Sequence, residues 1–260
     1  MSQFAKASKL FSDDMDLKSY IETLSFIDAR KKFFTAVKSS KIDTIFLVGD
    51  AGVGKTYLLN LLEKKSKTLK VAAHYSDMKF SDEDLLEDLL DCANVLVSKG
   101  EHSKNALIEN VKKHYKNLEY IVLIDNVGDI DKGRLEFFRY LIKLGIVKFV
   151  FSCRDKNFSD EGLNSKTIKI GSITKDEIER YIKKQLISND LKNEAKMFNK
   201  KEISLIHRYS NANFKRVKDI VKTAFEIAQI ASKKRLTEYA TLNHKTLTMA
   251  AIDLGIIDVK

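Results

Sequence analysis

The sequence predicts an α/β fold, in which a parallel sheet sandwiched by helices is followed by a small all-helical domain. Short, nearly continuous apolar runs alternate with amphipathic segments over residues 1–170, and only helical periodicity follows Gly171. Strands that are apolar along their whole length are typical of parallel sheets, because helices cover both faces of such a sheet. A chain of 260 residues is long enough for one large domain and one small domain.

The elements of the first domain follow from these alternating patterns. Residues 25–40 place apolar side chains on one face of a helix, and Ser81 precedes a run of acidic residues as a helix N-cap does. The strands are predicted at 44–48, 70–75, 120–124, 147–151 and 167–170. The helices between them are predicted at 57–62, from 82 through the leucines at 85–90, at 101–117 and at 135–144.

The second domain begins near Gly171. Thr174 and Glu177 have the spacing of a capping box, and apolar residues follow on one face of the helix that it opens. Further helices are predicted at about 201–209, 213–233 and 244–254. We therefore divide the chain into an α/β domain at 1–170, whose residues 1–24 are an N-terminal extension, and a helical domain at 171–260.

The charge of the chain is concentrated in the helical domain. The net charge is +10, of which residues 1–170 carry +3 and residues 171–260 carry +7. Such a basic surface suits nucleic acid, an anionic membrane surface or an acidic protein. Lysine-rich, solvated helix faces are the alternative explanation.

The composition favours a cytoplasmic protein that is not integral to a membrane. No apolar run approaches the roughly 18–20 residues of a membrane-spanning helix, and the first residues lack the apolar core of a secretory signal. Two cysteines, Cys92 and Cys153, cannot build a disulfide framework, which fits a reducing compartment.

A phosphate-binding loop is the strongest motif in the sequence. It matches G-x-x-x-x-G-K-[ST], with an apolar strand before it and an amphipathic helix after it. Glycines let the backbone wrap closely around a phosphate, and the following helix presents its positive end to the same anion. The motif predicts binding of ATP with Mg²⁺, with Lys55 at the β- and γ-phosphates and the Thr56 hydroxyl on the metal. The nucleotide-binding residues are Gly49, Asp50, Ala51, Gly52, Val53, Gly54, Lys55 and Thr56.

A second motif predicts the carboxylate that accompanies this loop. The run Tyr-Ile-Val-Leu-Ile at 120–124 ends in Asp125, as a Walker B strand does. In a phosphate-transfer site this carboxylate holds Mg²⁺, usually through water. We therefore predict Thr56 and Asp125 as the two metal-binding residues.

The order of these segments resembles the AAA+ superfamily. The loop is followed by Leu-Ile-Asp-Asn at 123–126, by Phe-Val-Phe-Ser-Cys-Arg at 149–154 and by a helical segment containing residues 210–228. Within AAA+ the sequence is most similar to the ExeA-like secretion ATPases and the related Orc/Cdc6 and transposition ATPases. The resemblance covers residues 22–256 and implies an αβα ATPase core, a helical lid and ATP-dependent self-association.

Asn126 departs from the family pattern. The family usually has a glutamate here, which positions the attacking water, whereas an amide can orient water without accepting its proton. We therefore predict slow hydrolysis, as in a nucleotide switch, and a higher turnover for Asn126→Glu.

The resemblance also implies sensor residues. Ser152 falls at the sensor 1 position, and Lys215 or Arg216 at the sensor 2 position of the lid, where the family has an arginine after a proline. This chain has no proline, and Phe214 takes that place. Arg154, Arg134 and Arg139 are candidates for an arginine finger that reaches a neighbouring subunit.

Two roles for such an ATPase stay open. One is action on a cell-envelope assembly for secretion, pilus formation or DNA uptake, in which a protein partner supplies the anchor. The other is a DNA-associated switch that binds duplex DNA through its phosphates without reading sequence. A signalling-type P-loop ATPase and a nucleotide-metabolising kinase are weaker alternatives, because the first normally keeps a proline motif and the second needs an arginine-rich lid.

Overall fold

The computed structural model describes residues 2–12, 23–65, 70–98, 102–115, 120–155 and 162–258. Their contacts divide the chain into two compact units, each of which is described by itself. The α/β unit comprises Asp28–Gly49 and Gly54–Ile170, and the helical unit comprises Met1–Ile27, Asp50–Val53 and Gly171–Lys260. The segment Asp50–Val53, inside the glycine-rich loop, is therefore grouped with the helical unit.

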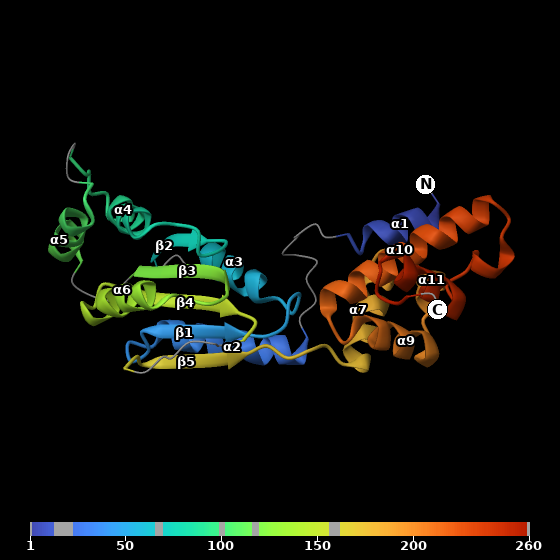
Figure 1. The fold of residues 1–260 in the computed structure, drawn as a ribbon. Coiled ribbons are helices and arrows are strands. Elements are labelled where there is room, and N and C mark those ends of the chain that lie inside the picture. Colours follow the sequence, from blue (N-terminus) through green and yellow to red (C-terminus); the bar gives the residue numbers. More distant parts are fainter. Residues whose placement is uncertain are drawn as a thin grey trace. The chain divides into compact units, whose positions relative to one another are not determined.

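A five-stranded sheet forms the centre of the α/β unit (Figure 1). The strand order is β2-β3-β4-β1-β5 and every neighbouring pair is parallel. The predicted parallel sheet is confirmed. Its strands are β1 (Thr44–Val48), β2 (Lys70–Tyr75), β3 (Tyr120–Val127), β4 (Val147–Cys153) and β5 (Ser165–Lys169).

Helices bury both faces of this sheet. Phe46, Phe149 and Phe151 point to one face and share a core with leucines of α4, while the alternate residues Ile45 and Val150 are also fully buried but lie outside that core. Successive side chains of a strand point to opposite faces, so the sheet has an apolar layer on each side. The helices are α2 (Leu24–Lys38), α3 (Lys55–Lys65), α4 (Asp82–Cys92), α5 (Lys104–His114) and α6 (Lys132–Lys143).

The register of the strands brings several chain segments to the carboxyl edge of the sheet. Val48 at the end of β1 is paired with Cys153 at the end of β4, and the Gly49 N–H continues the ladder to the Cys153 carbonyl at 3.3 Å. The β3–β4 pairing shifts register between Ile124 and Val127. Ligands of open parallel sheets bind outside this edge, and register shifts of this kind are common next to such sites.

The helical unit has a separate core around Phe225 of α10. Phe198 and Phe11 pack on its ring at centroid distances of 5.9 Å and 6.1 Å. The helices are α1 (Gln3–Lys9), α7 (Lys175–Ile187), α8 (Lys192–Lys196), α9 (Lys200–Ser210), α10 (Phe214–Lys233) and α11 (His244–Asp253), with a 3₁₀ turn η1 (Thr237–Tyr239).

The N-terminal residues belong to this helical core, whereas the sequence placed residues 1–24 ahead of the α/β domain. Ala7 and Phe11 are fully buried there, and the Phe11 ring also meets Tyr181 of α7 edge-on at 5.8 Å. The physical reason is the apolar face of α1, which α10 covers. No helix among the described residues is long and apolar enough to cross a membrane.

Candidate functional site

The glycine-rich loop joins the end of β1 to the start of α3. Gly52 and Gly54 have φ angles of 77° and 104°, which place both in the region that L-residues with a side chain rarely adopt. The loop therefore needs glycine at both positions in order to turn. Because α3 begins at Lys55, the loop ends on the N-terminus of a helix, whose N–H groups and positive dipole end attract anions.

The Lys55 side chain lies back over the start of the loop. Its ammonium donates a hydrogen bond to the Gly49 carbonyl at 2.6 Å, and the residue is only 9% exposed. A buried ammonium beside a row of backbone N–H groups is a strong anion-binding arrangement.

Asp125 is the centre of the polar network at this site. Its carboxylate is buried and accepts hydrogen bonds from the Thr56 hydroxyl at 2.5 Å, from the Ser152 hydroxyl, and from the Asn126 N–H at 2.9 Å. The structure thus brings together residues of α3, β3 and β4 that the sequence had identified separately. Three donors fix the orientation of the carboxylate.

Thr56 and Asp125 have the chemistry of a magnesium site. Mg²⁺ prefers oxygen ligands and keeps several waters, so that one or two protein ligands and the substrate phosphates complete its coordination. The described residues contain no cluster of three or more His, Cys, Asp or Glu that would hold a metal by itself. This donor set fits a metal that arrives together with a phosphate ligand.

Asn126 has an unusual backbone conformation that the sequence did not reveal. Its φ angle is 49°, in the left-handed region, at the point where the β3–β4 register shifts. Asparagine tolerates this region better than most residues do. The side-chain amide is exposed and donates to the Ser76 carbonyl at 3.1 Å, beyond the end of β2.

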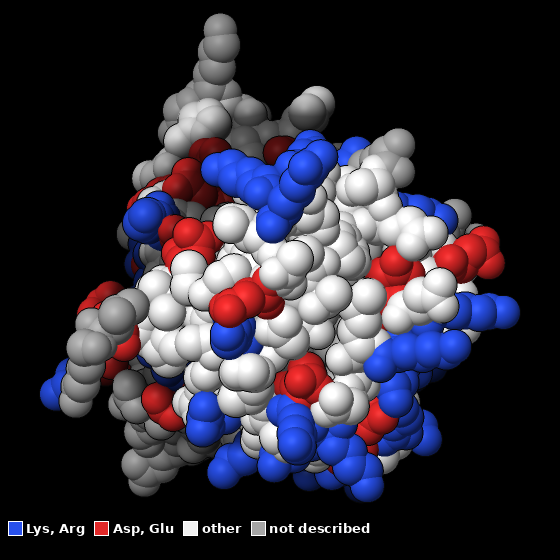
Figure 2. All heavy atoms as spheres, turned by 90° about the vertical axis from the view of Figure 1, so that its right-hand side faces the viewer, with Lys and Arg blue, Asp and Glu red and all other residues white. Residues whose placement is uncertain are grey.

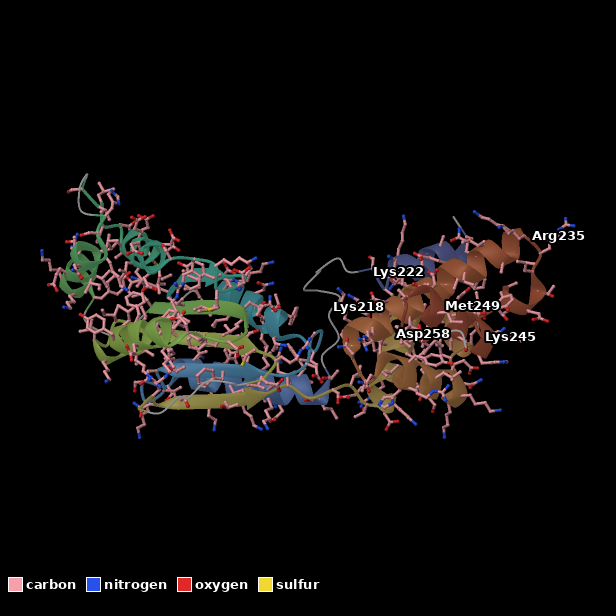
Figure 3. All side chains as sticks on the ribbon, in the orientation of Figure 1. Lys218, Lys222, Arg235, Lys245, Met249 and Asp258 are labelled. Carbon is pink, nitrogen blue, oxygen red and sulfur yellow. The ribbon has the colours of Figure 1, made fainter. Side chains whose placement is uncertain are left out.

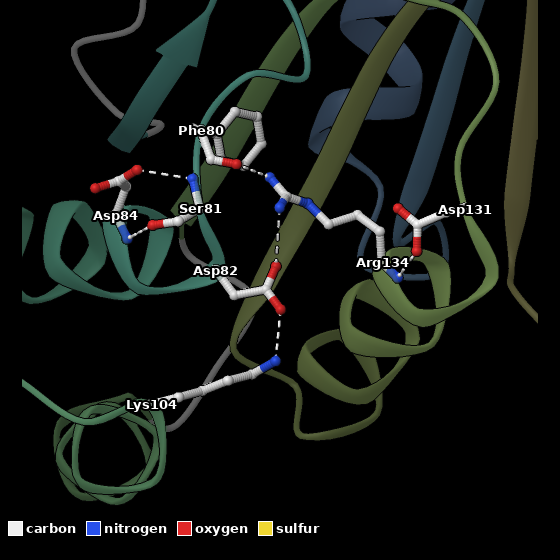
Figure 4. Close-up of polar contacts among 7 residues, drawn as sticks. All are labelled: Phe80, Ser81, Asp82, Asp84, Lys104, Asp131 and Arg134. Carbon is white, nitrogen blue, oxygen red and sulfur yellow. Dashed lines mark hydrogen bonds and ion pairs between the residues drawn. The ribbon is translucent and has the colours of Figure 1, made fainter.

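Arg134 is held inside its own unit, which corrects its candidacy as an arginine finger (Figure 4). Its guanidinium is 3.2 Å from an Asp82 oxygen, donates to the Phe80 carbonyl and lies 4.4 Å from the centre of the Phe80 ring. Lys104 contacts the other Asp82 oxygen at 2.5 Å. With its side chain only 15% exposed, Arg134 ties α6 to α4 and lacks the exposure that an arginine finger requires.

The other two arginine candidates lie in different surroundings. Arg139 is partly buried on α6, and its Nε atom is enclosed. Arg154 is exposed directly after β4, two residues beyond Ser152. Only Arg154 keeps the exposure that an arginine finger requires.

The predicted sensor 2 cations lie in the first turn of α10. Lys215 and Arg216 are exposed, and Asn213 caps the helix by accepting a hydrogen bond from the Arg216 N–H at 3.1 Å. Their role toward a nucleotide remains a prediction. Phe214, in the position of the family's proline, packs edge-on against Tyr181 at 4.7 Å.

These two rings border a cavity in the helical unit that the sequence did not indicate. Its volume is about 230 Å³, and its walls combine apolar and charged side chains. The only signal in the sequence was an aromatic residue directly before the lid cations. The lining residues are Thr23, Leu24, Ile27, Ile173, Glu177, Arg180, Tyr181, Lys184 and Phe214.

Comparison with known proteins identifies the α/β segment. Residues 41–158 match the model of the AAA domain, and no curated protein sequence matches the chain. Two similar solved structures are Drosophila ORC bound to DNA (TM-score 0.61, 14% identity, 96% of this chain covered) and Cdc6p from Pyrobaculum aerophilum (TM-score 0.57, 14% identity, 88% covered). The chain spans 65% and 66% of those two chains, just under two thirds of each. At this identity the likeness shows a shared fold.

Proposed function

Because residues 41–158 match the model of the AAA domain, we propose that the chain is an AAA+ P-loop protein that binds ATP with Mg²⁺ and hydrolyses it slowly, as a nucleotide-controlled switch. The observation that carries this proposal is the buried Asp125 carboxylate, on which Thr56 and Ser152 converge. A glycine-rich loop alone would support only anion binding. The loop together with an oriented carboxylate supports a magnesium–nucleotide site.

Each residue has a part in this proposed site. The loop N–H groups and the start of α3 would hold the phosphates, and the Lys55 ammonium, which donates to the Gly49 carbonyl, would serve the β- and γ-phosphates. Thr56 and Asp125 would hold Mg²⁺, which neutralises phosphate charge when bound. Ser152 is fully buried and donates to Asp125, so we assign it the positioning of that carboxylate.

Slow hydrolysis is proposed from the chemistry and the contacts of Asn126. Its amide has no basic site for the proton of an attacking water. Its nitrogen is also engaged with the Ser76 carbonyl, which holds the side chain toward the end of β2. The residue that usually activates water is therefore replaced by one that at most orients it.

The decisive experiment is Lys55→Ala, measured by direct ATP binding. We expect the affinity to fall at least about tenfold, because a charged donor to the phosphates is lost. Lys64→Ala, an exposed lysine near the other end of α3, is the matched control and should bind ATP normally. Unchanged affinity in Lys55→Ala would show that the loop does not bind nucleotide.

We propose two alternatives for the target of this switch, in a cytoplasmic protein that self-associates with ATP. One is a protein assembly at the cell envelope, as the resemblance to ExeA-like ATPases implies. The other is duplex DNA. The charge of +7 on residues 171–260 supports the second, as does the likeness in fold to a structure described as ORC bound to DNA.

A further inference from the structure

The helical unit has a basic hollow that the nucleotide site does not use. It has a volume of about 750 Å³ and lies between the start of α7 and the outer side of α9. Its lining contains four fixed cations, one histidine and no carboxylate. The lining residues are Lys175, Lys200, Lys201, Ser204, Leu205, His207 and Arg208.

The placement of these lysines opposes helix stability. Lys175 and Lys200 are the first residues of α7 and α9, where the helix dipole disfavours a positive charge. Lys201 adds a second cation to the first turn of α9. Positive charges at a helix N-terminus do not stabilise the fold. They increase the positive electrostatic potential at the N-termini of α7 and α9.

The acidic residues that face the interior do not neutralise this surface. Glu177 and Glu202 also lie in the first turns of α7 and α9, but each is only 8% exposed. Asp176, in the first turn of α7, is the exposed acid there and offsets one of the four cations. Glu177 accepts hydrogen bonds from the backbone N–H groups of Thr174 and Leu24. Lys175, Lys200, Lys201 and Arg208 are all exposed, so the outward potential of this face is positive.

Figure 2 shows this end of the helical unit. Lys and Arg side chains are numerous along its lower edge, with Asp and Glu side chains between them. Arg208 is steadied by Tyr209, whose ring centre lies 5.1 Å from the guanidinium carbon, and the Tyr209 hydroxyl contacts Thr248 of α11 at 3.0 Å. The cations of the hollow therefore lie on the helices α7 and α9 and not on a loop.

We infer that this hollow, the α9 hollow, binds the phosphate backbone of duplex nucleic acid. From Lys200 to Arg208 the helix rises about 12 Å, and a duplex carries a negative charge about every 1.7 Å of its axis. Several phosphates therefore face the row of cations at once. The Ser204 hydroxyl and the His207 ring add further hydrogen-bonding groups of the kind that position a backbone.

Other partners fit this surface less well. A single strand without sequence preference needs stacking aromatics, and none lines the hollow. A protein interface needs a buried apolar or aromatic anchor, and Leu205 is the one apolar side chain in the lining. Duplex nucleic acid would thus be the partner of the proposed switch, and its contact with the α9 hollow requires no bound nucleotide.

The test is anisotropy of a short labelled duplex of mixed sequence with the full chain and its Lys200→Glu/Lys201→Glu variant, with and without ATP and Mg²⁺. The wild type should bind, and its affinity should fall steeply between about 50 and 200 mM salt. The variant should lose about tenfold or more in affinity, and its salt slope should drop by about two. Its ATP affinity should stay normal, which separates this result from a failure of the nucleotide site.

Two lysines one turn apart on α10, Lys218 and Lys222 (Figure 3), provide the charge-matched control, since neither lines the hollow. Lys218→Glu/Lys222→Glu should retain most of the duplex affinity. The milder Lys200→Gln/Lys201→Gln variant guards against a folding defect and should show an intermediate loss. Equal binding by all variants, equal loss in the control, or displacement of the duplex by polyglutamate at matched charge would overturn the inference.

Discussion

Asn126 matters both for its backbone conformation and for the chemistry of its side chain. Its left-handed φ of 49° costs most L-residues about 1–2 kcal/mol, and asparagine is among the few that adopt it readily. The same residue occupies the position where the AAA+ pattern has a carboxylate that activates water. The left-handed backbone at the β3 register shift therefore favours asparagine, which in the proposed site would orient water without accepting its proton.

We expect Asn126→Glu to raise the ATP turnover and to lower the free energy of unfolding by about 1 kcal/mol. The gain comes from a carboxylate that can accept the proton, and the loss comes from the backbone conformation. Turnover at saturating ATP and chemical denaturation measure the two effects. Asn126→Gly, which fits the backbone but has no side chain, should not raise turnover. A folded glutamate variant with unchanged turnover would show that position 126 does not face the water.

Ser152 affects the site through Asp125. Ser152→Ala leaves the carboxylate with two donors in place of three, and a hydrogen bond to a charged group contributes about 1.5–3 kcal/mol. We expect the dependence of ATP binding on Mg²⁺ concentration to shift to higher metal by about tenfold. Titration of ATP affinity against Mg²⁺ tests this. Ser152→Thr keeps the hydroxyl and should restore the wild-type dependence, and an unchanged metal dependence in the alanine variant would remove Ser152 from the site.

At the scale of elements, a lysine buried in the sheet caps a helix. The Lys148 ammonium of β4 is 3% exposed and donates to the carbonyls of Val37 and Ser39 at 2.7 Å and of Ala36 at 3.4 Å. These carbonyls end α2, whose negative dipole end attracts the charge. Burial lowers the pKa of Lys148, and nearby Asp43 opposes that shift.

Lys148→Met should destabilise the fold by about 1–3 kcal/mol, because carbonyls at the end of α2 lose their donor in a buried place. Lys38→Met, at an exposed lysine of the same helix end, is the control and should have little effect. Thermal and denaturant unfolding measure the difference. Equal stability of the two variants would show that water replaces the lysine at this cap.

The same lysine gives a pH dependence of known sign. The pKa of Lys148 is lowered in the folded state from the usual 10.5. Between the folded-state pKa and 10.5, the unfolded chain therefore binds more protons than the folded chain does. The contribution of Lys148 to the free energy of unfolding therefore rises with pH. The stability difference between wild type and Lys148→Met should grow from neutral pH toward 10.5, and a difference that shrinks would contradict the burial of the ammonium.

The sequence predicted those elements whose signal is local. The apolar strands, the glycine-rich loop and the capped helices need only neighbours in the chain, and the order of the parallel strands places Asp125 and Ser152 at the same edge. The sequence missed features that depend on distant contacts. Lys148 resembles an exposed residue of an apolar strand until α2 ends over it, and Arg134 resembles a surface arginine until Asp82 and Phe80 enclose it.

At the scale of the whole molecule, the two proposed binding sites draw their side chains from different units. The α/β unit contains the Lys55, Thr56 and Asp125 side chains, and the helical unit contains the α9 hollow with its four cations. Nucleotide binding and nucleic-acid binding are therefore expected to fail separately in mutants. A surface that finishes the ATP site of a second copy is expected on the α/β unit, and Arg154 is the exposed arginine closest in sequence to the Asp125 network.

We therefore expect Arg154→Ala to bind ATP normally and to lose most of its turnover, if this arginine reaches the phosphates of a neighbouring copy. The decisive measurement mixes Arg154→Ala with Lys55→Ala. Each variant alone should be nearly inactive, because one lacks the arginine and the other cannot bind ATP. In the mixture, an Arg154→Ala chain that binds ATP can associate with a Lys55→Ala chain that supplies Arg154. Turnover should therefore recover in proportion to the number of such mixed dimers.

Sedimentation with ATP and with ADP should show association of the chains only with ATP. Arg180→Ala, an exposed arginine of the helical unit, serves as control. A mixture as inactive as its components would assign Arg154 to the surface and leave each ATP site complete within one chain.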